Sequence, residues 1–225
     1  MKVAPPQSEP ELCARAAALS GLTLEALAAR LASPVPADLR RAKGWVGQLV
    51  ERALGASAAS RDCPDFAEIG VELKTLPVDA RGHPVESTFV CTIALHELRE
   101  APWAESRVRR KLGRVLWVPV DGDRAIPVAR RRLGAALLWS PSEQEEAELR
   151  FDWEELGGII GRGGIESLTG HLGRCLQVRP KAAHSRVRRK AIDAEGDLTA
   201  TLPRGFYLRA SFTAGILQAH YALPR

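Results

Sequence analysis

The middle of the chain carries four short runs of β-branched and aromatic residues, and these constrain the fold most. They are VELKTLPV (71–78), STFVCTIAL (87–95), RVLWVPV (114–120) and AALLWS (135–140), and turn-forming residues such as ARGHP and DGDR separate them. Runs of this length and composition are typical of strands. They predict a β-meander, which is a largely antiparallel sheet at the centre of the molecule.

Helical patterns flank this predicted sheet. ELCARAAALSG ends at Gly21, LTLEALAARLA places its leucines on one face, and GWVGQLVERALG carries an apolar stripe that ends at Gly55. After the sheet, the sequence S-P-S-E offers Ser140 as a cap, a proline at the first helical position and Glu143 at the third. This arrangement is a capping box, and it predicts a helix from Ser140 to about Leu156.

The last third of the chain is mixed in character. Residues 157–174 are rich in glycine and are predicted to be irregular. RCLQVRP (174–180) and RGFYLRASF (204–212) predict strands, and TAGILQAHYAL predicts a final helix. The predicted fold class is therefore α/β, with a mixed, largely antiparallel central sheet flanked by helices.

The length of 225 residues bounds the number of domains. At roughly 150 residues per domain it corresponds to about one and a half, so we expect one large domain with lobes or two small ones that share a core. Residues 1–10 are predicted to be disordered, and their two adjacent prolines stand where a signal peptide would need an apolar run. Because no run of 18 apolar residues exists, we expect no membrane span.

The cysteines and histidines exclude several kinds of site. Cys13, Cys63, Cys91 and Cys175 are widely spaced and form no CxxC pair, so a zinc ribbon is not expected. Scattered thiols favour a reducing cytoplasmic location over a secreted disulfide framework. The five histidines form no HxH or HExxH pair, so the sequence offers no histidine-based metal site.

The formal net charge of +5 hides an uneven distribution. Residues 143–155 contain seven acids and one base, whereas residues 162–225 contain eleven bases and four acids. RVRRKLGR (107–114) holds five more bases and no acid. A solvated helix face explains the acidic segment, whereas the basic segments fit either a solvated face or a phosphate-binding surface.

The segment DFAEIGVELKT (65–75) carries the pattern D-x6-E-x-K. Side chains alternate along a strand, so Glu72 and Lys74 share one face while the residues between and beside them point to the core. Gly70 permits a sharp turn that brings Asp65 back toward this pair. Two carboxylates and a lysine are what phosphodiester hydrolysis with magnesium needs, because the acids hold the hard cation and the lysine holds the attacking water. The alternative interpretation is an exposed ion pair on a strand.

Eight motifs follow one another in a single order over nearly the full chain. They are KGWVGQLVERALGAS (43–57), DFAEIGVELKTLPVD (65–79), STFVC (87–91), RVRRKLGRVLWVPV (107–120), LLWSPSEQEE (137–146), DWEEL (152–156), LQVRPKAA (176–183) and TLPRGFYL (201–208). In these motifs the chain resembles the MutH family of DNA mismatch-repair endonucleases, which are relatives of certain type II restriction enzymes in the PD-(D/E)xK nuclease superfamily. The resemblance implies a single restriction-endonuclease-like domain over residues 1–225, a clamp of two lobes around a cleft for duplex DNA.

The resemblance also implies an active site. The family's metal ligands fall on Asp65, Glu72 and the carbonyl of Leu73, and its catalytic lysine falls on Lys74. The implied cofactor is Mg²⁺, as one ion or two, with Mn²⁺ or Ca²⁺ able to substitute in binding.

Two further residues of that active site lie outside the segment. The family's additional acid, carried on the preceding helix, falls on Glu51, and a second lysine near the catalytic centre falls on Lys111. From the residues alone, Glu51 is equally a solvent-exposed acid opposite the apolar stripe, and Lys111 is equally a surface charge.

DNA contacts are implied in the same way. The family recognises GATC and nicks the unmethylated strand 5′ to the G. Tyr207 matches the aromatic residue that lies near the adenine and senses its methyl group, although alone it is equally a half-buried strand residue. The remaining matches to DNA-contacting residues are Lys43, Gly44, Phe89, Arg179, Pro180 and Lys181. A basic side chain against guanine is the commonest specific contact in the major groove, whereas an isolated phenylalanine such as Phe89 is normally a core residue.

The implied protein is a monomeric, magnesium-dependent nicking enzyme whose activity is weak until a complex of MutS and MutL engages it, so MutL is an expected partner. The chain departs from the family pattern at residues 157–174 and 186–191. Two other functions stay open: a restriction-type nuclease that cuts both strands as a dimer, and a DNA-binding module that has lost cleavage. The intact set of Asp65, Glu72 and Lys74 argues against the last.

Overall fold

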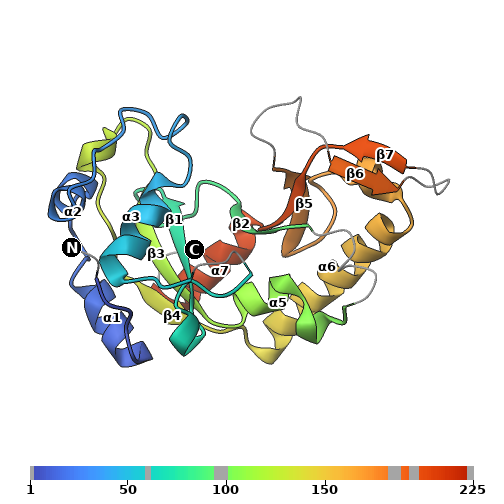
Figure 1. Ribbon diagram of the computed structural model, residues 1–225, viewed down its shortest axis with the longest axis horizontal. Coiled ribbons are helices and arrows are strands. Elements are labelled where there is room, and N and C mark those ends of the chain that lie inside the picture. The colour runs from blue at the N-terminus through green and yellow to red at the C-terminus, as the bar shows by residue number, and fades with distance from the viewer. Residues whose placement is uncertain (1–2, 59–61, 94–100, 182–188, 193–197, 222–225) are drawn as a thin grey trace. The chain divides into compact units, whose positions relative to one another are not determined.

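The structure is a computed structural model and describes residues 3–58, 62–93, 101–181, 189–192 and 198–221. The chain divides into two compact units, which are described separately. The first unit comprises residues 1–86, 114–140 and 214–225, and the second comprises residues 87–113 and 141–213. Figure 1 labels the elements of both units.

The first unit is a three-stranded sheet with helices packed against it. Its strands are β1 (Glu72–Val78), β3 (Val115–Asp121) and β4 (Leu137–Trp139), in the order β1-β3-β4, with β1 parallel to β3 and β3 antiparallel to β4. Its helices are α1 (Glu9–Ala17), α2 (Leu24–Arg30) and α3 (Trp45–Leu54), with short 3₁₀ turns η1 (Ala67–Ile69) and η3 (Val128–Arg130). Leucines of the three helices pack with Leu73, Leu116 and Val118 of the sheet in one hydrophobic core.

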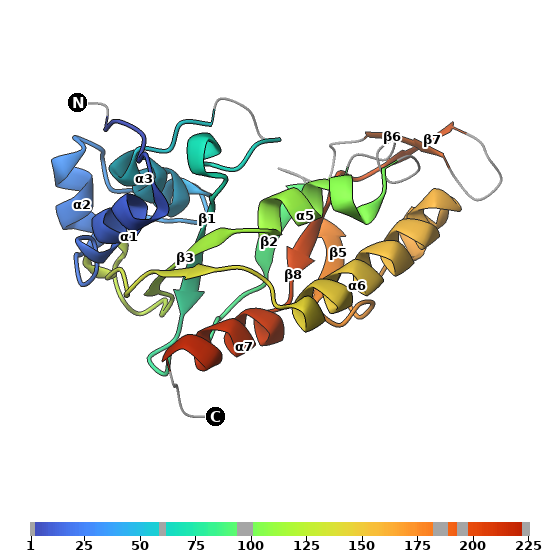
Figure 2. The same cartoon turned by 90° about the horizontal axis from the view of Figure 1, so that it is seen from below.

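The second unit is built on an antiparallel sheet and one long helix. Its sheet joins β2 (Thr88–Thr92), β5 (Leu176–Pro180) and β8 (Arg204–Leu208) in the order β2-β8-β5, and β6 (Arg189–Ile192) and β7 (Leu198–Thr201) form a separate hairpin. Its helices are α5 (Arg107–Leu112) and α6 (Glu143–Gly161), with 3₁₀ turns η2 (Trp103–Glu105) and η4 (Gly164–Ser167). Figure 2 shows α6 running beside β5 and β8. The last helix, α7 (Ala210–Tyr221), begins in the second unit and ends in the first.

The predicted fold class is confirmed, because mainly antiparallel sheets are flanked by helices, an arrangement consistent with a restriction-endonuclease-like fold. The predicted β-meander is wrong in two respects. β1 and β3 are parallel, and the run at 87–95 supplies β2 to the other sheet. A parallel pair needs a long crossover, and residues 79–114 supply it. The arrangement of two lobes around a cleft stays a prediction.

Strand β3 shows why the pattern of the sequence was misleading. All six residues from Val115 to Val120 are buried. A continuous buried run is typical of a central strand that is covered on both faces, as in parallel sheets. The apolar run RVLWVPV therefore indicated a central strand between β1 and β4, and not one arm of a meander.

Two helix boundaries also differ from the prediction. The capping box forms two residues later, between Ser142 and Glu145, because Glu145 is the acid that reaches back to the N–H of Ser142. Helix α6 then continues to Gly161 through two glycines that were expected to end it. Leu156 and Ile160 are buried, and this packing outweighs the cost of about 1 kcal/mol that a glycine brings to a helix interior.

The start of the chain is also more regular than expected. The expected disorder of residues 1–10 does not describe residues 3–10 of the structure. Ser8 caps α1, which begins at Glu9, and Pro6 is buried. Among the described residues no helix is long and apolar enough to cross a membrane, and all four cysteines are free.

A buried carboxylate joins α6 to the sheet of the second unit. Asp152 is 1% exposed and accepts hydrogen bonds of 2.6–2.9 Å from the N–H groups of Arg174, Cys175 and Leu176. Asp152 therefore fixes the point at which the chain enters β5.

Burial and the neighbouring Glu148 raise the pKa of the Cys175 thiol to about 12, so this residue is a neutral thiol at neutral pH.

We expect Asp152→Ala to lower the free energy of unfolding by about 2–4 kcal/mol, because it leaves buried N–H groups without an acceptor. The matched control is Glu154→Ala on the same helix. It removes only an exposed ion pair with Arg150, so its effect should stay below about 1 kcal/mol. Urea unfolding followed by circular dichroism measures both. Equal losses for the two variants would contradict this role of Asp152.

Candidate active site

Strand β1 has one free edge, because it lies at the end of the order β1-β3-β4. The N–H of Glu72 donates to the carbonyl of Arg114, at the start of the ladder with β3. Because alternate residues of a strand direct their main-chain groups to opposite sides, the N–H and carbonyl of Leu73 point to the free edge. This edge is where the acid of the preceding loop arrives.

Asp65 is brought to the free edge by a tight turn. Phe66 and Val71 exchange main-chain hydrogen bonds of 2.9 and 3.2 Å, and Gly70 closes the turn with φ of +68°, a conformation that favours glycine. As a result, the carboxylate of Asp65 accepts a hydrogen bond from the N–H of Leu73, with 2.9 Å between the nitrogen and the carboxylate oxygen. The sequence-based expectation that the chain turns back at Gly70 thus agrees with the geometry.

Glu72 and Lys74 form an ion pair on one face of β1. The side chain of Glu72 is only 3% exposed and that of Lys74 is 13% exposed. The alternative of an exposed ion pair is therefore wrong in its exposure. A carboxylate buried in this way requires a partner charge, because desolvation otherwise disfavours its ionised form.

Two tryptophans share the face of the sheet that carries this pair. In the register of the ladder, Lys74 lies opposite Trp117, and Val115, opposite Glu72, pairs with Trp139. The rings of Trp117 and Trp139 meet edge to face at 6.1 Å. Large aromatic side chains lower the local polarity, so charges beside them interact more strongly than in water. Sequence analysis did not identify either tryptophan, because their place beside the ion pair depends on the parallel register.

Glu51 faces β1 rather than away from it. Gly47 of α3 has no side chain, so there is open space between α3 and β1 at this residue. A Cβ placed on Gly47 would lie 3.7 Å from the Glu51 carboxylate and 3.9 Å from the hydroxyl of Thr75 on β1, so both groups border this space. Glu51 is partly buried. The interpretation of Glu51 as a solvent-exposed acid is therefore not supported, and α3 carries its carboxylate toward the face of β1 that bears the Thr75 side chain.

The donor atoms at this edge suit a hard cation. Asp65 and Glu72 supply carboxylate oxygens, and the carbonyl of Leu73 lies on the same free edge as Asp65. Mg²⁺ is held in proteins by one or two carboxylates and keeps several waters. Over the described part of the chain, no group of three or more His, Cys, Asp or Glu side chains is placed to hold a metal. Two carboxylates and a carbonyl leave coordination positions for water. This ligand set therefore suits Mg²⁺ better than it suits an ion whose ligands all come from the protein.

The second unit carries a cluster of rings and cations, which we call the aromatic–cation cluster: Phe89, Arg179, Lys181 and Tyr207. The rings of Phe89 and Tyr207 meet edge to face at 5.3 Å. The ammonium of Lys181 lies 4.0 Å from the centre of the Phe89 ring, and the Arg179 guanidinium lies 5.9 Å from the centre of the Tyr207 ring. A cation over the face of an aromatic ring is attracted electrostatically by that ring, and aromatic rings and cations together are used to hold nucleic-acid bases.

Gly205 makes room for this cluster. A Cβ at Gly205 would lie 2.8 Å from the Phe89 ring and 2.9 Å from the carbonyl of Cys91. Any larger residue would therefore displace Phe89. The sequence GFYL contains this glycine, but its importance follows only from the antiparallel register between β2 and β8.

The remaining predicted site residues are spread over both units. Lys43 and Gly44 are exposed and precede α3, where Gly44 adopts φ of +82°. Pro180 is exposed at the end of β5. Lys111 is buried in the last turn of α5, in the second unit. The structure thus gathers Asp65, Glu72, Lys74, Leu73 and Glu51 around β1, and it groups Phe89, Arg179, Lys181 and Tyr207 in the other unit. The roles of all these residues stay predictions.

Comparison with known proteins gives a consistent result. A family model described as "DNA mismatch repair enzyme MutH" matches residues 54–152, a range that includes Asp65, Glu72 and Lys74. "DNA mismatch repair protein MutH" of Klebsiella pneumoniae subsp. pneumoniae is 53% identical over 219 residues, 97% of this chain and 95% of the relative. The proteins of the same name from Yersinia enterocolitica and Yersinia pestis are each 54% identical over 220 residues, 98% of this chain and 96% of the relative.

We expect Lys74→Met to lower the free energy of unfolding by about 1–3 kcal/mol at pH 7, because it removes the cation that pairs with buried Glu72. In the double variant Glu72→Gln/Lys74→Met the buried charge is gone as well, so at least half of the loss should be recovered. Urea unfolding of the two single variants and the double variant measures the coupling. Strictly additive losses would contradict an ion pair that matters for stability.

Proposed function

The chain belongs to the MutH family of DNA mismatch repair enzymes, and on that premise we propose that it uses magnesium to nick the unmethylated strand of duplex DNA at GATC sites. As a member of this family it is a DNA endonuclease. The observation that carries the proposal is the hydrogen bond from Leu73 to Asp65, because it brings the first acid to the strand that carries Glu72 and Lys74.

The carboxylates of Asp65 and Glu72 and the carbonyl of Leu73 would hold the magnesium ion. When bound, magnesium supplies Lewis-acid polarisation of the scissile phosphate and offsets its negative charge. Asp65 is fixed for this role because the Leu73 N–H restrains one of its carboxylate oxygens. Glu72 is fixed because burial and the pairing with Lys74 leave its side chain little freedom.

Lys74 would orient the attacking water. Its ammonium is compact, is partly exposed and lies at the carboxylate of Glu72. A lysine in this position can hold a water by hydrogen bonding and can stabilise negative charge that develops on the phosphate oxygens during in-line attack. Glu51, whose carboxylate also faces β1, would add a further acceptor for waters of the metal, and Lys111 would add positive charge near the reacting phosphate.

The aromatic–cation cluster would read the DNA sequence. Arg179 and Lys181 suit guanine, which presents two acceptors in the major groove, and Tyr207 offers a partly exposed ring to the adenine. A methyl group on that adenine would collide with a ring held in place by Phe89. Lys43, Gly44 and Pro180 are exposed and would complete the contacts to bases and backbone.

The biological setting follows from the same premise. In mismatch repair the enzyme would act as a monomer in the cytoplasm and would be recruited by MutL after mismatch recognition. The free cysteines suit that reducing compartment. A role in strand choice also requires that the host cell methylates GATC.

We expect Asp65→Ala to lower the rate of nicking by about 1,000-fold, because it removes a metal ligand, while affinity for DNA changes by less than about threefold. The substrate is a plasmid with hemimethylated GATC sites in the presence of MgCl₂, and EDTA should abolish nicking by the unchanged protein. Asp123→Ala, which alters an exposed acid of the same unit, is the control. Nicking by Asp65→Ala at the rate of the control would refute the site.

We expect Tyr207→Ser to reduce the preference for unmethylated over fully methylated GATC by about tenfold, since one methyl group in a fitted site is worth about 10–200-fold. Tyr207→Phe keeps the ring and should keep the preference. The measurement is the ratio of nicking rates on the two substrates under single-turnover conditions. An unchanged ratio for Tyr207→Ser would remove Tyr207 from methyl discrimination.

A further inference from the structure

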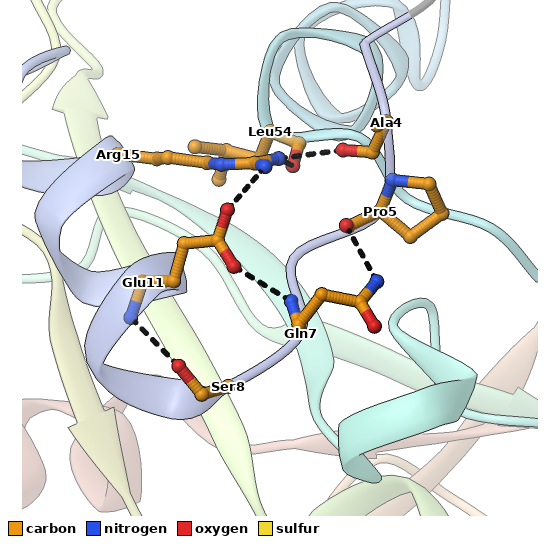
Figure 3. Close-up of polar contacts among 7 residues, drawn as sticks. All are labelled: Ala4, Pro5, Gln7, Ser8, Glu11, Arg15 and Leu54. Atoms are coloured by element: carbon orange, nitrogen blue, oxygen red, sulfur yellow. Dashed lines mark hydrogen bonds and ion pairs between the residues drawn. The ribbon is translucent and has the colours of Figure 1, made fainter.

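Arg15 joins three parts of the first unit through one guanidinium group. In the last turn of α1, its Nη1 donates to the carbonyl of Ala4 at 2.6 Å and to the carbonyl of Leu54 at 3.0 Å. Its Nη2 donates to the carboxylate of Glu11 at 2.6 Å. Figure 3 shows the side chain lying between the segment before α1 and the end of α3.

The contact with Leu54 stabilises the end of α3. The last four carbonyls of a helix have no partner within the helix, and a positive charge at that end also interacts favourably with the helix dipole. Leu54 is the last residue of α3 and Gly55 follows it with φ of +84°. Arg15 therefore caps α3 from another helix.

The segment before α1 is packed closely against this end of α3. A Cβ at Gly55 would lie 2.3 Å from the carbonyl oxygen of Ala4, which is closer than any side chain allows. The same carbonyl is bonded to Arg15. The N–H of Gln7 donates to the second carboxylate oxygen of Glu11 at 2.8 Å, so Glu11 holds both the segment and Arg15.

The end of α3 is connected to the metal-binding acids. The N–H groups of Gly55 and Ala56 donate to the carbonyl of Glu51. Glu51 is therefore the first residue of the last turn of α3, which is the turn that Arg15 caps. The N–H groups of Ser57 and Ala58 then donate to the carbonyl of Asp65 at 3.0 and 3.1 Å. The path from Arg15 to Asp65 therefore consists of the last turn of α3 and these two main-chain hydrogen bonds.

We infer that Arg15 is a positioning residue of the endonuclease site, which holds the last turn of α3 so that Glu51 and Asp65 keep their places at β1. This inference rests on the function proposed above. Arg15 acts through α3 and the main chain of Ser57, and it has no contact with substrate in this role. Its loss should shift the acids by a fraction of an ångström, and misplacement on that scale lowers catalytic rates strongly.

The test compares Arg15→Met and Arg15→Lys with the control Arg132→Met. Arg132 also lies in the first unit and also donates to a distant carbonyl, that of Gly21 at 2.7 Å. Within the described part of the chain, its hydrogen bonds are made with Asp121 and Gly21 and do not reach α3. For each protein we would measure the single-turnover nicking rate on hemimethylated GATC duplex, the DNA and Mg²⁺ concentrations that give half the maximal rate, and the thermal midpoint.

We expect Arg15→Met to lower the maximal nicking rate by about tenfold and to raise the half-saturating Mg²⁺ concentration several-fold, with the half-saturating DNA concentration unchanged. Arg15→Lys restores the charge and one hydrogen bond, so its rate should lie between those of Arg15→Met and the unchanged protein. Arg132→Met should keep both the rate and the Mg²⁺ dependence. This pattern would support the inference even if both Met variants lose thermal stability.

The inference is overturned if Arg15→Met nicks at the rate of the unchanged protein, or if its rate and Mg²⁺ dependence match those of Arg132→Met at equal thermal stability. Should Arg15→Met fail to fold, Glu11→Gln replaces it, because this change weakens the hold on Arg15 while keeping a hydrogen-bond acceptor. A normal rate and Mg²⁺ dependence for Glu11→Gln would then overturn it. If the unchanged protein does not nick GATC duplex at all, the proposed function fails and not the role of Arg15 alone.

Discussion

The hydrogen bond from the Leu73 N–H to the Asp65 carboxylate is the interaction on which the site depends. An edge strand normally leaves a row of unpaired main-chain groups, which is a hazard for aggregation. In this protein the free edge of β1 makes hydrogen bonds at both ends of the strand. The N–H of Leu73 donates to the carboxylate of Asp65, and the N–H of Val85 donates to the carbonyl of Pro77. The edge thereby becomes a place where a loop acid and a strand carbonyl meet.

The ion pair of Glu72 and Lys74 adds charge to a part of the sheet that would otherwise be apolar. Trp117 and Trp139 on the same face are buried, so solvation of the pair is poor and each charge depends on the other. A hydrophobic pair at these positions would satisfy the fold at least as well. The presence of two charges at this point of a buried sheet is therefore better explained by chemistry than by stability, which agrees with the general concentration of unfavourable groups at functional sites.

The sequence was informative where the cause is local. Alternation along a strand placed Glu72 and Lys74 on one face, Gly70 indicated the turn of Asp65, and the apolar stripe and glycine stop located α3. It failed where the cause is tertiary. The parallel pairing of β1 with β3 depends on a crossover of more than thirty residues. The packing of Leu156 and Ile160 outweighs the tendency of the glycine pair Gly157 and Gly158 to end α6. The cap that Arg15 provides for α3 joins residues 39 positions apart, and no short-range pattern could reveal it.

The chain order interleaves the two sets of predicted site residues. Asp65, Glu72 and Lys74 belong to the first unit, and the aromatic–cation cluster belongs to the second, yet β1 is followed directly by β2 in the sequence. The chain passes between the units after residues 86, 113, 140 and 213. Each unit also has its own polar anchor, Arg15 at the end of α3 and Asp152 at the start of β5. Because contacts within each core hold its own set of predicted site residues, a substitution in the core of one unit need not disturb the predicted site residues of the other.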